Sequence, residues 1–271
     1  MKLSAYKIFR YLRIWWLQIR CGLMQRMAYP YNFYLMVVGV FVQMVLSIAF
    51  IDIIFKFVDN ISGWTKEGAM MILASYMILE GLMWATCSFI SGIQRNVRMG
   101  TMDMIITRPI DTQFLVSVWR ADPEDWMRPF TALIIFGINI NGLGVWGASL
   151  FFNICFYFIM LFFGFLILYS ITLFIKTVAF WVIEGSALWS LGDTVSKLSQ
   201  YPTDIFFHKS VKMFFSIIIP VTFMTTIPVK ILINGPKFSL MFYSFLLVLI
   251  FFIASRKFFH FGLKNYKSAS S

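Results

Sequence analysis

The sequence predicts an all-α polytopic membrane protein with six transmembrane helices. Of its 271 residues, 60% are hydrophobic and only 13% are charged, whereas soluble domains carry about 25% charged residues. The 32 phenylalanines and nine tryptophans suit lipid-facing surfaces and interfacial belts. No polar stretch is long enough to bury a core of its own, so we expect no separate soluble domain. We also expect no signal peptide and, from three widely spaced cysteines, no disulfide framework.

The first element is an amphipathic helix over residues 4–29, which Pro30 ends. Its apolar residues recur at helical spacing and its basic residues gather on another face, which is typical of a helix lying flat among lipid headgroups. Packing against a soluble partner is the alternative. The apolar stripe is Ile8, Leu12, Trp15, Ile19 and Leu23, and the basic face is Lys2, Arg10, Arg13 and Arg20.

Six apolar runs follow, separated by turn residues and charges. The segment 122–125 (DPED) reads as a helix start, with aspartate as cap and proline in the first turn. Residues 199–237 carry four prolines, which predicts a broken re-entrant hairpin. The expected spans are 33–55, 67–92, 126–141, 145–175, 178–198 and 238–253.

The basic residues decide the topology. With six spans, the segments on one side, which are 1–30, 94–128, residue 176 and 256–271, hold 16 of the 23 basic residues and all ten arginines. A seventh span within 211–233 would export the basic tail, against the positive-inside rule. We therefore expect both termini and the 94–128 loop in the cytoplasm. The same rule accounts for the net charge of +11 without a nucleic-acid partner.

The polar, basic stretch 94–109 is the most distinctive part of the chain. Gly100 gives a loose start, Asp103 favours a first helical turn, and Pro109 forbids continuation. A helix of about two turns is expected between the arginines. A solvated cytoplasmic loop that merely obeys the positive-inside rule is the alternative. The arginines are Arg95, Arg98 and Arg108.

Catalytic and metal-binding patterns are missing from the sequence. It contains no phosphate-binding G-x-x-x-x-G-K-[ST] loop and no hydrolase motif, and His208 and His260 stand alone. Glu80 and Glu184 fall inside expected spans, where each acid costs about 2.5–3.5 kcal/mol to insert. They could face a cavity, attract a cationic substrate or stabilise a subunit contact. Alternatively, they are protonated or hydrogen-bonded acids packed between helices.

Five segments, in this order, resemble the permease subunits of type-2 ATP-binding-cassette (ABC-2) exporters. They are similar to a bacterial subfamily with a G-x-L-D-x-x-L-x-R-P loop after span two, although methionine replaces the first leucine of that motif. The likeness covers nearly the whole chain. The segments are GWTKE at 63–67, GTMDMIITRP at 100–109, AFWVIEG at 179–185, YPTDIF at 201–206 and GLKNYKSAS at 262–270.

The resemblance implies a division of the chain into functional parts. Residues 1–30 would be a cytoplasmic connecting helix and 31–271 the transmembrane domain, with a coupling loop at 94–112 and an extracellular re-entrant region at 199–237. The coupling helix near 100–108 would dock on the ATPase. The docking residues would be Arg98, Gly100, Asp103, Arg108 and Pro109; the interfacial helix would use Arg10, Arg13, Trp15 and Arg20; and the translocation path would include Glu80 and Glu184.

The resemblance also implies partners. Two ATPase subunits would carry ATP and Mg, so this chain would bind no cofactor and no metal itself and would not be an enzyme. A second permease chain, identical or different, would complete the path in the plasma membrane of a bacterium. The exported substrate would be an amphipathic small molecule or peptide. Two alternatives stay open: a membrane-embedded enzyme that modifies lipid or prenyl groups, and a proton-coupled secondary transporter that uses the two intramembrane acids.

Overall fold

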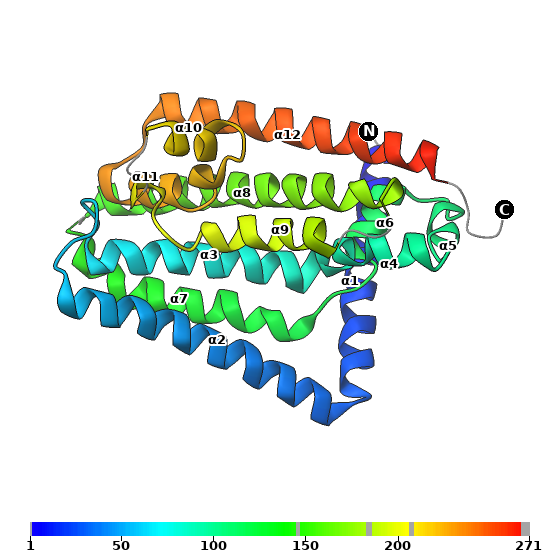
Figure 1. Ribbon diagram of the computed structural model, residues 1–271, viewed down its shortest axis with the longest axis horizontal. Coiled ribbons are helices and arrows are strands. Elements are labelled where there is room, and N and C mark those ends of the chain that lie inside the picture. Colours follow the sequence, from blue (N-terminus) through cyan, green and yellow to red (C-terminus); the bar gives the residue numbers. More distant parts are fainter. Residues whose placement is uncertain (1, 145–146, 183–185, 206–208, 267–271) are drawn as a thin grey trace.

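The computed structural model describes residues 2–144, 147–182, 186–205 and 209–266. Apart from an isolated bridge between Ile61 and Trp64, the regular elements in these ranges are all helical. Most helices lie along one direction, whereas α1 (Lys2–Met27) crosses one end of the bundle (Figure 1). The expectation of an all-α architecture is therefore confirmed for the described residues.

Four segments of the described chain are long and apolar enough to cross a membrane. They are α2 (Pro30–Phe57), the continuous helical segment Lys66–Arg98, the segment Ser149–Phe180, and α12 (Phe238–Asn265). The second contains α3 (Lys66–Cys87), η1 (Ser88–Gly92) and α4 (Ile93–Arg98), and the third is formed by α8 (Ala148–Thr177) and η4 (Val178–Phe180). Pro30 ends one helix, as expected, and also occupies the first turn of the next, where its missing N–H does no harm.

The third and fifth expected spans correspond to shorter helices. In place of 126–141 the chain forms η2 (Pro123–Trp126), α7 (Met127–Asn139) and η3 (Ile140–Leu143). The described part of 178–198 is η4 and α9 (Ser186–Leu198). At 13 residues each, α7 and α9 are about 20 Å long, less than the roughly 30 Å of a hydrocarbon core. The count of six spans therefore stays a prediction.

The segment 199–237 is broken into short helices, as its prolines predict. η5 (Thr203–Ile205) and α10 (Lys209–Ile217) precede Pro220, and η6 (Val221–Phe223) and α11 (Thr226–Asn234) follow it. α11 is buried against α8, where the amide of Asn153 donates to the carbonyl of Leu232 at 3.0 Å. This region lies at the end of the bundle opposite α4, α5 (Asp103–Ile106) and α6 (Thr112–Val118) (Figure 1).

α3 is the central helix. Met71, Ile72 and Ala74 are fully buried. On one side, the hydroxyl of Ser75 shares a 2.9 Å hydrogen bond with that of Tyr157 on α8. On another side, α7 approaches so closely that a Cβ on Gly81 would lie 2.8 Å from the Cβ of Arg128. Polar groups on α3 must therefore find partners within the protein.

The close approach of α3 and α7 predicts that Gly81→Ala destabilises the fold. The added methyl would collide with α7, so overpacking should lower the free energy of unfolding by about 1–3 kcal/mol. The matched control is Gly39→Ala on α2, where an added Cβ meets nothing within 4 Å. Thermal unfolding in detergent should show a lower melting temperature for Gly81→Ala alone. Equal melting temperatures for the two variants would contradict this packing.

Candidate functional site

The loop between α3 and α6 is a compact hairpin at the end of the bundle where α1 crosses (Figure 1). Gly100 ends α4 with φ of +69°, a left-handed conformation that favours glycine. Met102 is fully buried and Ile105 nearly so, and both belong to the main apolar core. The loop is therefore anchored from within and is part of the folded body.

The helix within this loop is shorter than the sequence predicts. α5 has four residues, about one turn, where the sequence pattern predicts about two turns. The left-handed Gly100 and the turn at Thr101 delay the helix start until Asp103. Thr107 closes the other end, because its hydroxyl donates to the carbonyl of Asp103 at 3.0 Å, and Pro109 follows.

The outward side of the hairpin combines apolar and cationic side chains. Met99 and Met104 are each more than 60% exposed, and Ile106 is also exposed. Arg98 and Arg108 are exposed beside them. We call these five residues the loop tip. Exposed methionine and isoleucine next to arginine are a composition that favours protein contacts.

α1 holds the C-terminal side of this loop. Arg10 donates to the carbonyl of Pro109 at 3.4 Å, and the hydroxyl of Tyr11 accepts from the backbone N–H of Asp111 at 3.3 Å. The rings of Tyr11 and Phe114 meet edge to face, with centroids 4.7 Å apart. The structure thus brings the predicted Arg10 and Pro109 together.

The predicted apolar stripe of α1 divides between two faces. Trp15 and Ile19 are half-buried towards the bundle, whereas Ile8, Leu12 and Leu23 are exposed. The predicted basic residues Arg13 and Arg20 are exposed as well. One apolar face therefore packs on the protein and a second is open, and the expected contact of that open face with the membrane stays a prediction.

α12 holds the loop from another side. Arg256 donates to the carboxylate of Asp111 at 2.8 Å and to the side-chain oxygen of Gln113 at 3.2 Å. Asp111 also caps α6, since its carboxylate accepts from the N–H of Phe114 at 3.0 Å. Further along, burial and the nearby carboxylate of Asp103 raise the pKa of the Tyr266 hydroxyl. The loop is therefore joined to both the first and the last helix.

The acidic segment 122–125 makes ion pairs that the sequence pattern does not indicate. Arg26 of α1 binds the carboxylates of Asp122 and, at 2.9 Å, of Glu124. Arg120 contacts Asp122 at 3.2 Å. Asp122 precedes η2, but its side chain makes no capping hydrogen bond. The predicted helix start at Asp122 and Pro123 is confirmed, but the predicted side-chain cap is not formed, because the arginines bind the carboxylate of Asp122.

A second ion cluster lies deeper and involves Glu80. Arg128 of α7 donates to Glu80 at 3.0 Å and to Asp125 at 2.8 Å, and its third contact is the side-chain oxygen of Gln43 on α2 at 2.8 Å. Glu80, Asp125 and Arg128 are all buried. Glu80 is thus a paired acid between helices, which favours the second of the two interpretations of this residue.

Asp125 is the member of this cluster nearest the end of the bundle. Burial raises the pKa of its carboxyl to about 6, although the hydrogen bond and charge of Arg128 act in the opposite direction. Its carboxylate accepts the hydrogen bond from Arg128 at 2.8 Å. The guanidinium therefore bridges two carboxylates, one from α3 and one from η2.

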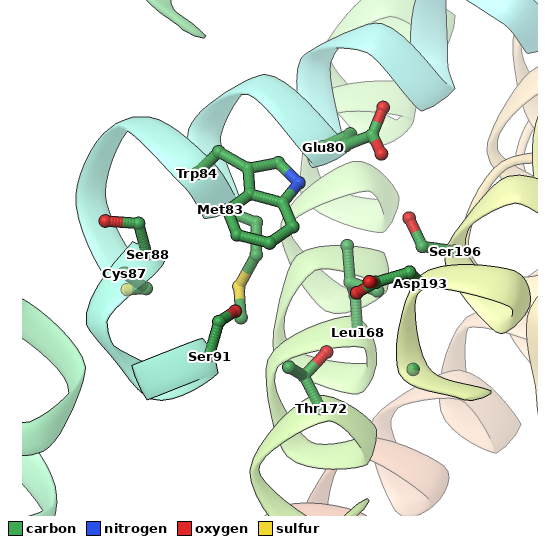
Figure 2. Close-up of a pocket in the computed structure, with 11 residues that line it drawn as sticks. Glu80, Met83, Trp84, Cys87, Ser88, Ser91, Leu168, Thr172, Asp193 and Ser196 are labelled. Carbon is green, nitrogen blue, oxygen red and sulfur yellow. The ribbon is translucent and has the colours of Figure 1, made fainter. Parts of the chain in front are cut away.

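A narrow cavity borders Glu80 (Figure 2). Its walls come from α3 and η1, from α8, and from α9, whose Asp193 and Ser196 point towards α3 (Figure 2). Its volume is about 20 Å³, enough for about one water molecule. The lining is mixed: Ser88, Ser91 and Thr172 contribute hydroxyls, and Met83 and Leu168 contribute apolar surface.

A second cavity continues this lining towards the loop. It has a volume of about 280 Å³ and shares Trp84, Ser88 and Ser91 with the first. Its outer walls include Arg95 and Arg120. The shared residues make a nearly continuous surface, lined by both polar and apolar side chains, from the basic loop to the level of Glu80. The other predicted path residue, Glu184, lies outside the described residues.

The described residues contain no group of three or more histidine, cysteine, aspartate or glutamate side chains placed to hold a metal ion. The comparison with protein families is decisive here. The sequence model of a family described as "ABC-2 family transporter protein" matches residues 41–270, which is most of the chain. The chain belongs to the ABC-2 family of transporter proteins. No curated protein and no solved structure matches it.

Membership in the family establishes the broad role. ABC-2 proteins are the multi-pass membrane permease components of ABC transporters, and they work with ABC ATPase subunits in a membrane complex. The chain is therefore a transport subunit. The match begins at residue 41, so α1 precedes it. The bacterial subfamily and its loop motif stay predictions.

The sequence analysis did not predict the ion-pair and hydrogen-bond contacts of three residues: Gln43, Arg26 and Arg128. Arg128 lies two residues inside an expected span, and an intramembrane arginine calls for an acidic partner. That signal could have paired it with Glu80, the acid within the neighbouring expected span. Gln43 and Arg26 carry no comparable signal in the sequence.

The Arg128 cluster predicts an unequal effect of two similar substitutions. Arg128→Met would leave Glu80 and Asp125 buried without their cation, which should destabilise the permease by about 3–5 kcal/mol. Arg120→Met removes a half-exposed arginine from Asp122, and the expected loss is about 0–1 kcal/mol. Thermal unfolding of the purified variants measures both. A loss for Arg128→Met no greater than for Arg120→Met would show that the cluster contributes little.

Proposed function

We propose that this chain is the permease subunit of an ATP-driven exporter and that its loop tip docks on the partner ATPase. The observation that supports docking is the combination of exposed Met99, Met104 and Ile106 with the arginines beside them, on a loop anchored by Met102. An apolar cleft with an acidic rim on the ATPase would complement this surface. The wider set of docking residues is Arg98, Gly100, Asp103, Arg108 and Pro109.

The contacts of the loop suggest how ATPase motion would reach the membrane. α4 is continuous with α3 through η1, so a push on the tip acts along a central helix. Pro109 and Asp111 transmit the same push to α1 through Arg10 and Tyr11 and to α12 through Arg256. ATP and Mg would be bound by the ATPase, and this chain would convert closure of the two ATPase copies into movement of its helices.

The surface from Arg95 to Glu80 is the part of the path that this chain would contribute. Asp193 and the indole of Trp84 would favour a cationic or polar group on an amphipathic small molecule or peptide. A second permease chain, identical or different, would close the path. The long apolar face of α2, exposed from Tyr34 to Ile53, is available for that chain or for lipid. The complex would reside in the plasma membrane of a bacterium, with the loop and both termini in the cytoplasm.

Two other functions have less support. A lipid- or prenyl-modifying enzyme needs free acids or metal ligands, but Asp122 and Glu124 are paired with Arg26. A proton-coupled carrier needs an acid that gains and loses a proton. Glu80 is buried and paired with Arg128 at 3.0 Å, so it is engaged in a structural ion pair between helices.

The docking proposal is tested by purifying the tagged permease from its native membranes. We expect an ATPase subunit with a phosphate-binding loop to co-purify and to hydrolyse ATP. Met104→Asp should lower the amount retained by at least about tenfold, because a charge would enter an apolar contact. The control is Phe57→Asp, at a still more exposed apolar residue at the opposite end of the bundle. Undiminished retention with Met104→Asp, or full activity of the chain without any ATPase, would reject the proposal.

Charge reversal tests coupling as distinct from assembly. We expect the double variant Asp103→Lys with Arg108→Glu to insert normally but to hydrolyse ATP without export, because both residues lie where the loop meets its supports. The Arg108 guanidinium lies 5.9 Å from the ring centroid of Trp119, and Asp103 lies near Tyr266. ATPase rate and transport are measured on the same vesicles, with Arg13→Glu on the exposed side of α1 as control. Normal transport in the double variant would count against coupling through this loop.

A further inference from the structure

A groove with a polar rim lies between α6, α8 and α12, and its rim includes the Arg256–Asp111 ion pair that joins α12 to the loop. Its volume is about 280 Å³. The inner walls are apolar, with Phe165, Leu166 and Phe252 among them. Complete ligand sites usually measure about 300–1,000 Å³, so this groove suits one apolar chain of a larger molecule.

The rim of the groove carries one cation and one anion in a fixed arrangement. Arg256 and Asp111 both line it and are joined at 2.8 Å. Gln113, which is almost fully buried, accepts from Arg256 at 3.2 Å and donates to the hydroxyl of Tyr169 at 3.0 Å. The hydroxyl of Ser117 completes the set, 2.8 Å from that of Tyr169. These contacts hold the guanidinium and the carboxylate in place without a ligand.

The position of the rim along the helices matches a membrane interface. Arg256 follows directly on the long apolar run of α12, which is where charged residues reach the headgroup layer. Phe252 is one turn deeper on the same helix, and the neighbouring surface of α12 exposes Phe245 and Leu249. The groove is therefore polar at headgroup level and apolar at the level of the acyl chains.

We propose that this groove binds a zwitterionic phospholipid whose headgroup carries a primary ammonium. Its phosphate would bind Arg256, its ammonium would bind Asp111, and one acyl chain would lie against Leu166 and Phe252. Arg256 has five N–H donors, of which two are used within the protein. A primary ammonium donates hydrogen bonds to a carboxylate, whereas a quaternary choline has no N–H. An anionic headgroup would be repelled by Asp111.

The test uses the full-length purified chain in detergent, mixed with equal amounts of phosphatidylethanolamine, phosphatidylcholine and phosphatidylglycerol. Native mass spectrometry then counts the lipids that remain bound. We expect phosphatidylethanolamine to exceed each of the others by at least about fivefold. An excess of phosphatidylglycerol, or equal retention of all three, would overturn the proposal and leave a non-selective lipid contact.

Two variants of rim residues test separately the binding of the phosphate and of the ammonium group of the lipid. Arg256→Gln should lower total lipid retention by about tenfold, since it removes a charge-assisted contact to phosphate. Lys257→Gln, an exposed neighbour outside the lining, should change nothing. Asp111→Asn keeps a good α6 cap, so lipid should stay bound but without preference for ethanolamine over choline. Unchanged selectivity in Asp111→Asn would overturn the assignment of the ammonium.

The acyl contact has its own test. Leu166→Trp would fill the apolar part of the groove and should remove bound lipid of every headgroup class. Glycerophosphoethanolamine, the same headgroup without chains, should not compete at the concentration of the lipid. Competition by this soluble headgroup would show that the apolar walls do not matter and would overturn the proposal. This competition experiment distinguishes binding of an acyl chain in the groove from binding of the phosphate alone. It does not depend on whether Leu166→Trp folds.

Discussion

The position of Arg128 constrains much of the permease. A guanidinium buried among membrane helices is stable only when its charge and hydrogen bonds are satisfied, and here α3, η2 and α2 each supply a partner. Its side chain therefore fixes the relative positions of three elements that are far apart in the sequence. If Glu80 or Gln43 were removed, the buried guanidinium would still need a partner. The helices around Arg128 are therefore held together by its ion pairs and hydrogen bonds as well as by apolar packing. The neighbouring pairs of Arg26 extend that unit to α1.

This arrangement places the loop between α3 and α6 at a junction. α1 is attached to the acidic segment 122–125 through Arg26 and to the loop through Arg10 and Tyr11. α12 reaches the same loop through Arg256. A force applied at the loop tip would therefore reach three long helices. It would reach α3 through α4 and η1, α1 through Arg10 and Tyr11, and α12 through Arg256. In the proposed mechanism the energy enters from a partner ATPase, and such a junction would pass it to the helices.

Much of the local structure follows from the sequence. Prolines 30, 109 and 220 and Gly100 mark breaks where the structure has them, because these residues restrict or release the backbone locally. The long apolar runs mark the four segments that could span a membrane. The end of η4 at Phe180 was not predictable, since apolar residues continue at Trp181 and Val182.

Of the pairings at the candidate site, only that of Arg128 with Glu80 had a signal in the sequence, namely an arginine and an acid in neighbouring expected spans. Arg128 and Glu80 are 48 residues apart, and Arg256 and Asp111 are 145 apart, so no periodicity connects them. The division of the α1 stripe has a related cause. Lipid and protein interior both favour apolar side chains, and hydropathy cannot distinguish half-buried Trp15 from exposed Leu12.

Gly164 on α8 has a consequence for motion at the far end of the bundle. An added Cβ there would lie 2.6 Å from the carbonyl oxygen of Met224, so the two backbones nearly touch. Two backbones packed this closely cannot shift past each other unless they first move apart. The segment that ends in α11 must then travel with α8 as one rigid block. In the proposed exporter, an opening at this end of the bundle would then form along a different border, such as the one between this block and α9.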